Sequence, residues 1–256
     1  MKLKLPSPSE LGDRIRDTEV WKSIFRPGSV FRKGYKDTSR DRALATMNNV
    51  LYHLHPVKVK RHGLKLTYTF CLGGLSFFLF ILLTITGIFL MFFYRPMADI
   101  GGAQAFTDMQ NIHTTVFFGD LVRNLHRWGA HLMVFSVSLH MARVFYTGAY
   151  KPPREFNWVV GVILLFLTLG LSFTGYLLPW DQLAIWAVTV GTSLGGYAPF
   201  IAKQANFLLL GGAVVGPETL LRWYVLHVLA LPFVLVIFLA VHFWRIRKDG
   251  GISGPL

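Results

Sequence analysis

Four long apolar segments alternate with polar and basic segments along the chain. They cover residues 68–94, 125–147, 157–178 and 222–244 approximately. A helix needs roughly 20 apolar residues to cross a bilayer, and the hydrocarbon interior offers backbone polar groups no partner outside a helix. The pattern therefore predicts an all-α integral membrane protein whose four spans pack as a four-helix bundle.

The segment before the first span has apolar residues at helical spacing, three and four positions apart. They are Leu11 and Ile15, then less regularly Trp21, Ile24 and Phe25, and finally Leu44, Met47, Leu51 and Leu54. With basic residues between them, they predict amphipathic surface helices that lie either on anionic lipid or on a partner subunit. We expect residues 1–60 to form this N-terminal extension and residues 61–256 the four-helix transmembrane domain.

The charge distribution adds an orientation to this picture. The chain is 53% apolar and has a formal net charge of +13, but its basic residues lie in blocks outside the apolar segments. A nucleic-acid-binding face would carry them as a stripe or patch, so nucleic acid is not expected as a partner.

Twenty-one Lys and Arg residues fall before the first span, in the second connection or in the tail, against five on the other side. The positive-inside rule then predicts both termini on the cytoplasmic side. The polar, basic first sixty residues disfavour a cleaved secretory signal.

Two of the spans carry histidines at matched spacing. His126 and His140 are fourteen residues apart in the second span, and His227 and His242 are fifteen apart in the fourth. These spacings leave net rotations of about −40° and +60° and rises of about 21 and 22 Å along an α-helix. Each span therefore offers two imidazoles on roughly one side, at two depths.

The second and fourth spans run in the same direction, which determines how the histidines pair. His126 meets His227 near the outer face and His140 meets His242 near the inner face, and each pair could supply both axial nitrogens of a heme iron. His131 has no partner at its depth and is interpreted as a packing residue. The remaining histidines lie outside the spans, where solvated side chains are expected: His53, His55, His62 and His113.

The other two spans carry glycines with the same spacing. Gly73 and Gly87 are fourteen residues apart in the first span, as are Gly161 and Gly175 in the third. Small residues alone would indicate close helix packing. The spacing shared with the histidines favours room for a flat macrocycle at two depths.

Two hemes about 20 Å apart along the membrane normal predict transmembrane electron transfer. Two histidine ligands leave no open iron position, which argues against oxygen chemistry. The third connection, residues 179–222, is long and apolar. Because loops of that length are usually functional, we expect it to lie in the outer membrane interface and to cover part of the bundle.

Several motifs resemble those of the cytochrome b6 family, the heme-bearing N-terminal subunits of quinol-oxidising Rieske/cytochrome b complexes. They are FCLGG at 70–74, HRWGAH at 126–131, LHMARVFYTGAYKPPRE at 139–155, TGYLLPWDQ at 174–182 and IRKDGGISGPL at 246–256. The resemblance runs from about residue 60 to the end. About 36 extra residues precede the matched region, and their role is unknown.

This resemblance implies roles for individual residues. His126 and His227 would ligate the outer, low-potential heme b, and His140 and His242 the inner, higher-potential one. Cys71 would attach a heme c through one thioether, whereas without the resemblance it is read as an inert thiol because no CxxCH motif is present. Arg123 and Arg247 match positions near heme propionates, or are surface charges that set the topology. Trp180 and Asp181 match the border of the outer quinol site, or are an interfacial anchor and a helix start.

The resemblance also implies an enzyme complex. The chain would be the electron-transfer subunit of a quinol:cytochrome c or plastocyanin oxidoreductase that translocates protons. Expected partners are a subunit IV-like C-terminal half of cytochrome b, a Rieske iron-sulfur protein and a c-type cytochrome, in a homodimeric complex in the lipid membrane. The long extension favours a bacterial cytoplasmic membrane over a thylakoid. The alternative function is a di-heme membrane anchor of a peripheral dehydrogenase or hydrogenase.

Overall fold

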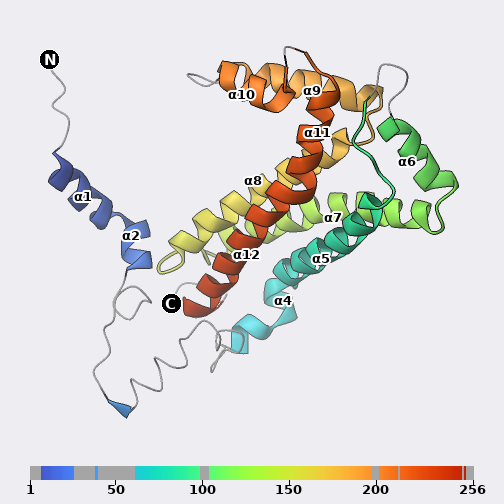
Figure 1. The fold of residues 1–256 in the computed structure, drawn as a ribbon. Coiled ribbons are helices and arrows are strands. Elements are labelled where there is room, and N and C mark those ends of the chain that lie inside the picture. The colour runs from blue at the N-terminus through green and yellow to red at the C-terminus, as the bar shows by residue number, and fades with distance from the viewer. Residues whose placement is uncertain are drawn as a thin grey trace. The chain divides into compact units, whose positions relative to one another are not determined.

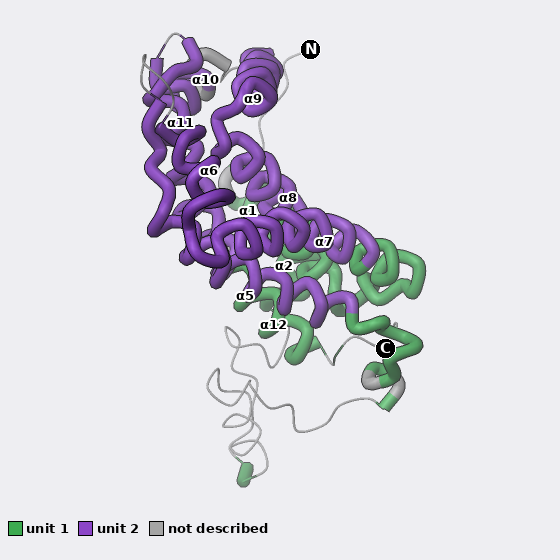
Figure 2. The backbone as a smooth tube through the Cα atoms, turned by 90° about the vertical axis from the view of Figure 1, so that its right-hand side faces the viewer, with its two compact units in different colours: residues 1–71, 140–164, 238–256 green, residues 72–139, 165–237 purple. Residues whose placement is uncertain are grey.

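The structure, a computed structural model, describes residues 7–25, 38–39, 61–98, 104–197, 202–212, 214–249 and 251. Its regular elements in these ranges are all helical, and we find no strand among them (Figure 1). The chain forms two compact units, which Figure 2 colours separately. Unit 1 comprises residues 1–71, 140–164 and 238–256, and unit 2 comprises residues 72–139 and 165–237. The all-α prediction is confirmed.

Four long helical segments match the four predicted spans. They are α5 (Leu72–Met91), α7 (Gly119–Tyr146), α8 (Glu155–Leu177) and a fourth segment made of α11 (Pro217–Val225), η3 (Leu226–Ala230) and α12 (Leu231–Lys248). In the described part of the chain, three of these are both long and apolar enough to cross a membrane: Leu72–Met91, Glu155–Leu177 and Pro217–Lys248. The protein is therefore an integral membrane protein. The 28-residue α7 is long enough, but its charged residues and histidines lower its hydropathy, so its assignment as a span stays a prediction.

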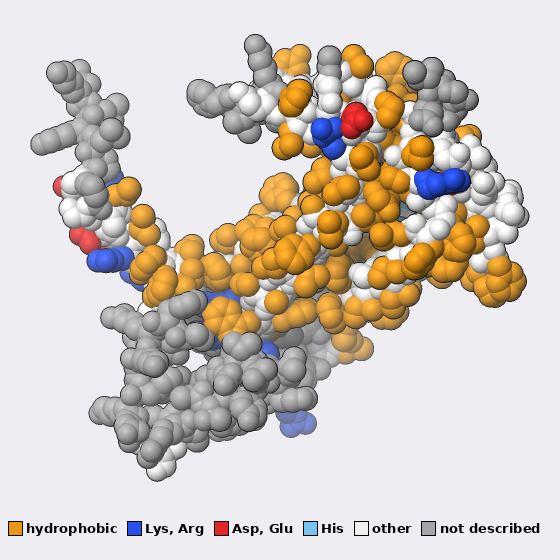
Figure 3. Space-filling model, viewed as in Figure 1, with side chains coloured by type: hydrophobic (Ala, Val, Ile, Leu, Met, Phe, Trp, Pro, Cys, Tyr) orange, Lys and Arg blue, Asp and Glu red, His pale blue; other side chains and the backbone are white. Residues whose placement is uncertain are grey.

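Hydrophobic side chains cover the visible surface of the long helices (Figure 3), as expected for helices that face lipid. Examples on α5, α7 and α8 are Ile85, Phe135 and Phe166, each more than 60% exposed. Exposed apolar side chains of this size on a soluble protein would mark an aggregation or binding surface. Here they indicate the lipid-facing sides of the spans.

Unit 2 has two buried clusters. In the first, Leu79 of α5 packs with Met133 and Val137 of α7, and the hydroxyls of Ser76 and Ser136 form a hydrogen bond of 3.0 Å between the same two helices. The second cluster joins the end of α8 to α6 (Gln104–Thr114), α9 (Gln182–Gly195) and α11. Its buried members are Tyr94, Ala98, Ala105, Ile112, Leu177, Leu178, Trp180, Val188, Leu220 and Trp223. The long third connection is thus built from α9 and α10 (Ala202–Leu210), with α9 packed into this core.

Unit 1 contains two short helices of the N-terminal extension. In α1 (Pro8–Asp17), Leu11 and Ile15 are exposed, so this face of the amphipathic helix is uncovered. In α2 (Glu19–Ile24), Ser23 is buried. The predicted surface helix through Leu44, Met47, Leu51 and Leu54 lies outside the described residues. Helices η2 (Arg61–Leu64) and α4 (Leu66–Thr69) precede the first span.

The fourth segment contains a wide helical turn. Its first helix begins at Pro217 after the cap residue Gly216, a position where proline loses no hydrogen bond. The π-helical η3 ends directly before Leu231 and Pro232. Because Pro232 has no N–H for the carbonyl of Val228, the regular ladder is interrupted there, and a π turn accommodates the break. His227 lies within this turn.

A buried carboxylate fastens α6 to the end of the first span. Asp108 is 3% exposed and accepts hydrogen bonds from Arg95 Nη2 (2.8 Å), Arg95 Nε (3.0 Å) and Gln104 Nε2 (2.8 Å). The hydrogen bonds from Arg95 hold the pKa of Asp108 below its usual value, against the opposing effect of burial. This ion pair joins α6 to the residues that directly follow the first span.

We expect Asp108→Asn to lower the free energy of unfolding by roughly 1 to 3 kcal/mol at pH 7, since charge-assisted hydrogen bonds to a buried group are lost. A depressed folded-state pKa stabilises the fold above the unfolded pKa of about 3.9, and this stabilisation disappears as the pH falls through the folded value. The gap between wild type and variant should therefore begin to narrow below about pH 4 and continue to narrow as the pH falls further. Thermal unfolding in detergent, followed by circular dichroism from pH 3 to 7, checks this. The exposed Asp13→Asn is the control, and a gap that is constant over this range contradicts the assignment.

Candidate functional site

The first histidine pair lies in unit 2 and is called the outer pair. His126 of α7 and His227 of η3 face each other with ring centroids 6.2 Å apart and ring planes at 72°. The hydroxyl of Thr86 contacts His126 Nδ1 at 2.8 Å, and the hydroxyl of Thr174 contacts His227 Nδ1 at 3.0 Å. The two rings are thus held from the two helices that carry no paired histidine, α5 and α8.

The threonine contacts favour one tautomer of each ring. Thr86 Oγ1 donates to the carbonyl of Leu82 at 2.8 Å, and Thr174 Oγ1 donates to the carbonyl of Leu171 at 3.1 Å. Each hydroxyl proton is therefore used, and the oxygen accepts from the imidazole Nδ1–H. The Nε2 atoms then carry lone pairs, as a metal-binding imidazole requires.

Two glycines make space for the outer pair. A Cβ on Gly175 would lie 2.6 Å from His227 Cε1, and one on Gly87 would lie 3.2 Å from His126 Cε1. Both distances are shorter than an ordinary contact, so the glycines allow the rings to sit directly against the neighbouring helix. The predicted glycine positions thus clear the imidazoles themselves.

The second histidine pair, called the inner pair, lies in unit 1. His140 of α7 and His242 of α12 have ring centroids 6.4 Å apart and ring planes at 78°. Their Nδ1 atoms are buried without a hydrogen-bond partner in the described part of the chain. A Cβ on Gly161 would lie 3.9 Å from His242 Cε1, an ordinary contact. The inner pair is therefore held less closely than the outer pair.

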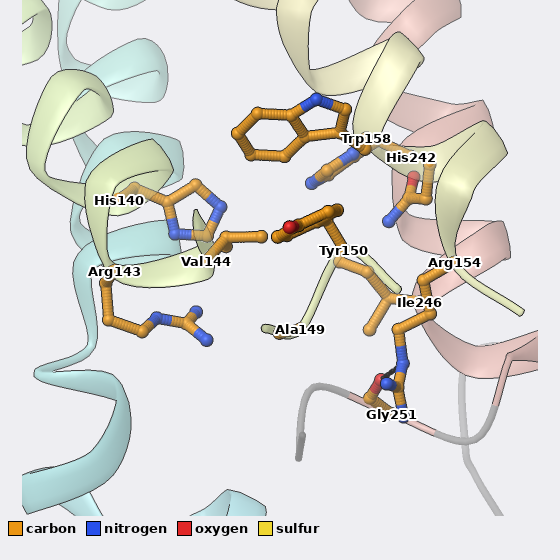
Figure 4. Close-up of a pocket in the computed structure, with 11 residues that line it drawn as sticks. His140, Arg143, Val144, Ala149, Tyr150, Arg154, Trp158, His242, Ile246 and Gly251 are labelled. Atoms are coloured by element: carbon orange, nitrogen blue, oxygen red, sulfur yellow. Dashed lines mark hydrogen bonds between the residues drawn. The ribbon is translucent and has the colours of Figure 1, made fainter. Parts of the chain in front are cut away.

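The inner pair opens onto a recess that is continuous with solvent (Figure 4). Its lining comes from α7, α8, α12, the connection between α7 and α8, and one glycine after α12. The lining residues are His140, Arg143, Val144, Ala149, Tyr150, Arg154, Asn157, Trp158, His242, Ile246 and Gly251. Arg143 Nε and Nη1 and Asn157 Oδ1 are buried and have no hydrogen-bond partner among the described residues. Two guanidinium groups beside an imidazole pair favour a ligand that carries carboxylates.

Both pairs fit an iron held between two imidazoles. Two rings that bind one metal from opposite sides, through bonds of about 2.0 Å, have centroids roughly 6 Å apart. Within the described residues, no group of three or more His, Cys, Asp or Glu side chains could enclose a metal. Each pair would thus supply two ligands only, and a planar macrocycle would supply the rest.

The other predicted site residues have these positions. Cys71 is an exposed free thiol between α4 and α5, at a φ of 51°, and Gly73 is half-buried near the start of α5. Arg247 is half-buried on α12 and does not line the recess. Trp180 is 7% exposed in the core of unit 2, and Asp181 caps α9 by accepting from the Ala184 N–H at 2.8 Å.

His113 and His131, which belong to neither pair, have different surroundings. His113, expected to be solvated, lies between Asp120 Oδ1 and Arg123 Nη1 and hydrogen-bonds to both. Arg123 is thereby held at the start of α7. His131 is exposed and contacts the ring of Trp128 at 5.6 Å, away from both pairs.

Four residues near the pairs were missed from the sequence. Thr86 and Thr174 each directly precede a predicted glycine, and Arg143 lies one helical turn after His140. Arg154 belongs to the KPPRE stretch. Their adjacency to predicted site residues was the available signal, but only the structure shows that they face the imidazoles or the recess.

Comparisons with known proteins agree with this geometry. The profile of the family Cytochrome b/b6/petB matches residues 57–250. Cytochrome b6 of Heliomicrobium gestii is 47% identical over 202 residues, which are 79% of this chain and 91% of that protein. The menaquinol:cytochrome c reductase cytochrome b subunit of Bacillus subtilis (strain 168) is 45% identical over 190 residues, 74% of this chain and 83% of that protein.

A solved structure supports the fold. A chain of a hyperthermophilic respiratory Complex III superimposes with a TM-score of 0.66 and 29% identity, over 86% of this chain and 55% of that chain. This chain thus spans about half the length of that one. The histidine pairs, the helical fold and these matches together show that the chain belongs to the cytochrome b/b6 family, whose members bind heme b.

Proposed function

We propose that this chain is the electron-transfer subunit of a quinol:cytochrome c or plastocyanin oxidoreductase, with one heme b at each histidine pair. The observation that carries the proposal is the two imidazole pairs, with centroids 6.2 and 6.4 Å apart. His126 and His140 lie on one continuous helix, fourteen residues apart, a rise of about 21 Å. Heme b supplies a one-electron iron couple when bound, and a pair of histidine ligands would leave no open iron position.

The residues around each pair have distinct roles in this proposal. Thr86 and Thr174 hold the Nδ1 atoms of the outer imidazoles, so that Nε2 would be the nitrogen available to a heme iron. Arg143 and Arg154 line the inner recess and are suited to bind heme propionates. Arg123 and Arg247, the positions matched by family resemblance, remain propionate candidates at the outer and inner hemes.

His126→Leu should lower the heme b content from two to one per chain, because a heme with one axial ligand is weakly held. His140→Leu should have the same effect on the other heme. The pyridine hemochrome spectrum of the purified protein measures the content. The matched control on the same helix is His131→Leu, for which two b hemes are expected. An unchanged heme content in both pair variants would overturn the assignment of the ligands.

Gly175→Ala and Gly161→Ala should differ, although both add one methyl group on the same helix. The methyl at Gly175 would lie 2.6 Å from His227 Cε1, against 3.9 Å from His242 at Gly161. Overpacking of this kind costs about 1–3 kcal/mol. We therefore expect Gly175→Ala to reduce or distort the outer heme and Gly161→Ala to leave the inner heme intact. Low-temperature α-band spectra distinguish the two, and equal spectra for both variants contradict the proposal.

The proposal includes a third heme, attached covalently at Cys71. What supports it is the exposed, unpaired thiol and the FCLGG motif. Heme staining on a denaturing gel should label the wild-type subunit, while Cys71→Ser should lose the stain and keep two b hemes. If the wild-type subunit shows no covalent stain, Cys71 is an inert thiol.

The proposed complex contains further subunits that take part in quinol oxidation. Quinol would be oxidised at the outer side, bordered by Trp180 and Asp181. One electron would go to a Rieske protein and then a c-type cytochrome, and the other would cross the membrane. A subunit IV-like chain would complete the quinol sites in a homodimer, with both termini of this chain on the cytoplasmic side of a bacterial membrane. Co-purification with a Rieske protein supports this assembly, whereas co-purification with a peripheral dehydrogenase or hydrogenase would identify a di-heme membrane anchor.

A further inference from the structure

The N-terminal extension contacts the end of the fourth helix through one buried serine. Ser23 of α2 is 6% exposed. Its carbonyl accepts from Arg245 Nη1 at 3.1 Å, and its hydroxyl oxygen accepts from Arg245 Nη2 at 2.5 Å. The same hydroxyl donates to the carbonyl of Pro153 at 3.2 Å. One residue of α2 therefore joins α12 to the connection between α7 and α8.

The cation in this contact has no access to solvent. Arg245 and Asp249 are both fully buried and form an ion pair of 3.0 Å. The guanidinium also lies over the ring of Phe156 at 5.2 Å, a cation–π contact that is stronger in a desolvated site. Asp249 balances the charge, and Ser23 accepts two of the remaining N–H groups. A buried guanidinium with unmade hydrogen bonds is costly, so the fold of this end of α12 depends on α2.

Both elements that Ser23 joins are walls of the inner recess. Arg245 lies one helical turn after His242 on α12 and precedes Ile246, which lines the recess. Pro153 precedes Arg154, which also lines the recess and donates from Nε to the carbonyl of Gly251 at 3.0 Å. A change at Ser23 would thus affect the positions of the His242 ring and the Arg154 guanidinium, which line the same recess.

The extension lies outside the part of the chain that the family shares. The family match begins at residue 57, so α2 is an addition to the common domain. We infer that Ser23, through Arg245 and Asp249, is a positioning residue for the inner pair, and that α2 is a clasp that holds two walls of the inner recess together. The redox consequence of this inference rests on the heme that is proposed at the inner pair. The clasp itself does not depend on that heme.

The clasp can be tested on the wild-type protein, purified with its hemes in detergent. Amide hydrogen exchange of α2 should be slower than that of α1 by on the order of tenfold or more, because α2 is bound by charge-assisted hydrogen bonds and α1 is not. Equal exchange in the two helices overturns the clasp. This measurement requires no variant and no electron-transfer activity.

The positioning role is tested by single substitutions. Ser23→Ala should shift the midpoint potential and the electron paramagnetic resonance signal of the inner heme alone, which is identified by its loss in His140→Leu. Ser23→Thr retains the hydroxyl and should restore the wild-type values, and Ser9→Ala on exposed α1 is the matched control. No shift in Ser23→Ala, or equal shifts of both hemes, refutes the positioning role.

A double-mutant comparison tests the route of the effect. In a background with Arg245→Met and Asp249→Asn, which removes the buried ion pair as a unit, Ser23→Ala should cause no additional shift. An additional shift of the same size would show that Ser23 does not act through Arg245. If the wild-type protein contained no heme b, the proposed function would fail, while the exchange measurement would still decide whether the clasp exists.

Discussion

The placement of imidazole rings between packed helices is the constraint on which the rest of the structure depends. A ring nitrogen that must stay bare for a metal cannot also be satisfied by the protein, and an unpaired polar atom away from water costs free energy. At the outer pair, Thr86 and Thr174 hydrogen-bond to the Nδ1 atoms. The Nε2 atoms are left for the metal. Gly87 and Gly175 then let the rings approach the neighbouring helices. Helices α5 and α8 therefore contribute to the site although they supply no ligand.

The two pairs use the same residue type in unlike surroundings. The outer imidazoles are hydrogen-bonded and tightly flanked, whereas the inner ones have Nδ1 atoms without a partner among the described residues and face an open recess. The inner recess also carries Arg143 and Arg154, while the guanidinium of Arg123 is held by His113. Because hydrogen bonding, charge and solvent exposure all adjust a heme potential, identical ligand pairs need not be equivalent. Under the proposed function, this asymmetry would set different potentials for the two hemes.

The inner end is also where the added segment of this chain meets the shared domain. Arg245 is a cation with no exposed surface, and its partners come from its own helix, from Phe156 and from the extension. Removing one partner from such a buried network is destabilising, because it leaves a buried charge without compensation. The extension is thus part of unit 1, which also contains the inner pair.

The sequence by itself determined the helices and the pairing proposed for the histidines. Long apolar runs allow only helical spans in lipid. The histidine spacings and the span directions pair His126 with His227 and His140 with His242, and the ring centroids of these pairs lie 6.2 and 6.4 Å apart. Only the tertiary structure decided what surrounds them. Trp180, for which the sequence left open a quinol-site border or an interfacial anchor, is a core residue because α9 folds back onto α8 and α11. The third connection, expected in the outer membrane interface, contains the helices α9 and α10. His113 contacts Asp120 and Arg123, and Ser23 contacts Arg245 across more than two hundred residues of sequence. Periodicity along one helix reports which face a residue occupies, but not which side chain of another helix meets it there.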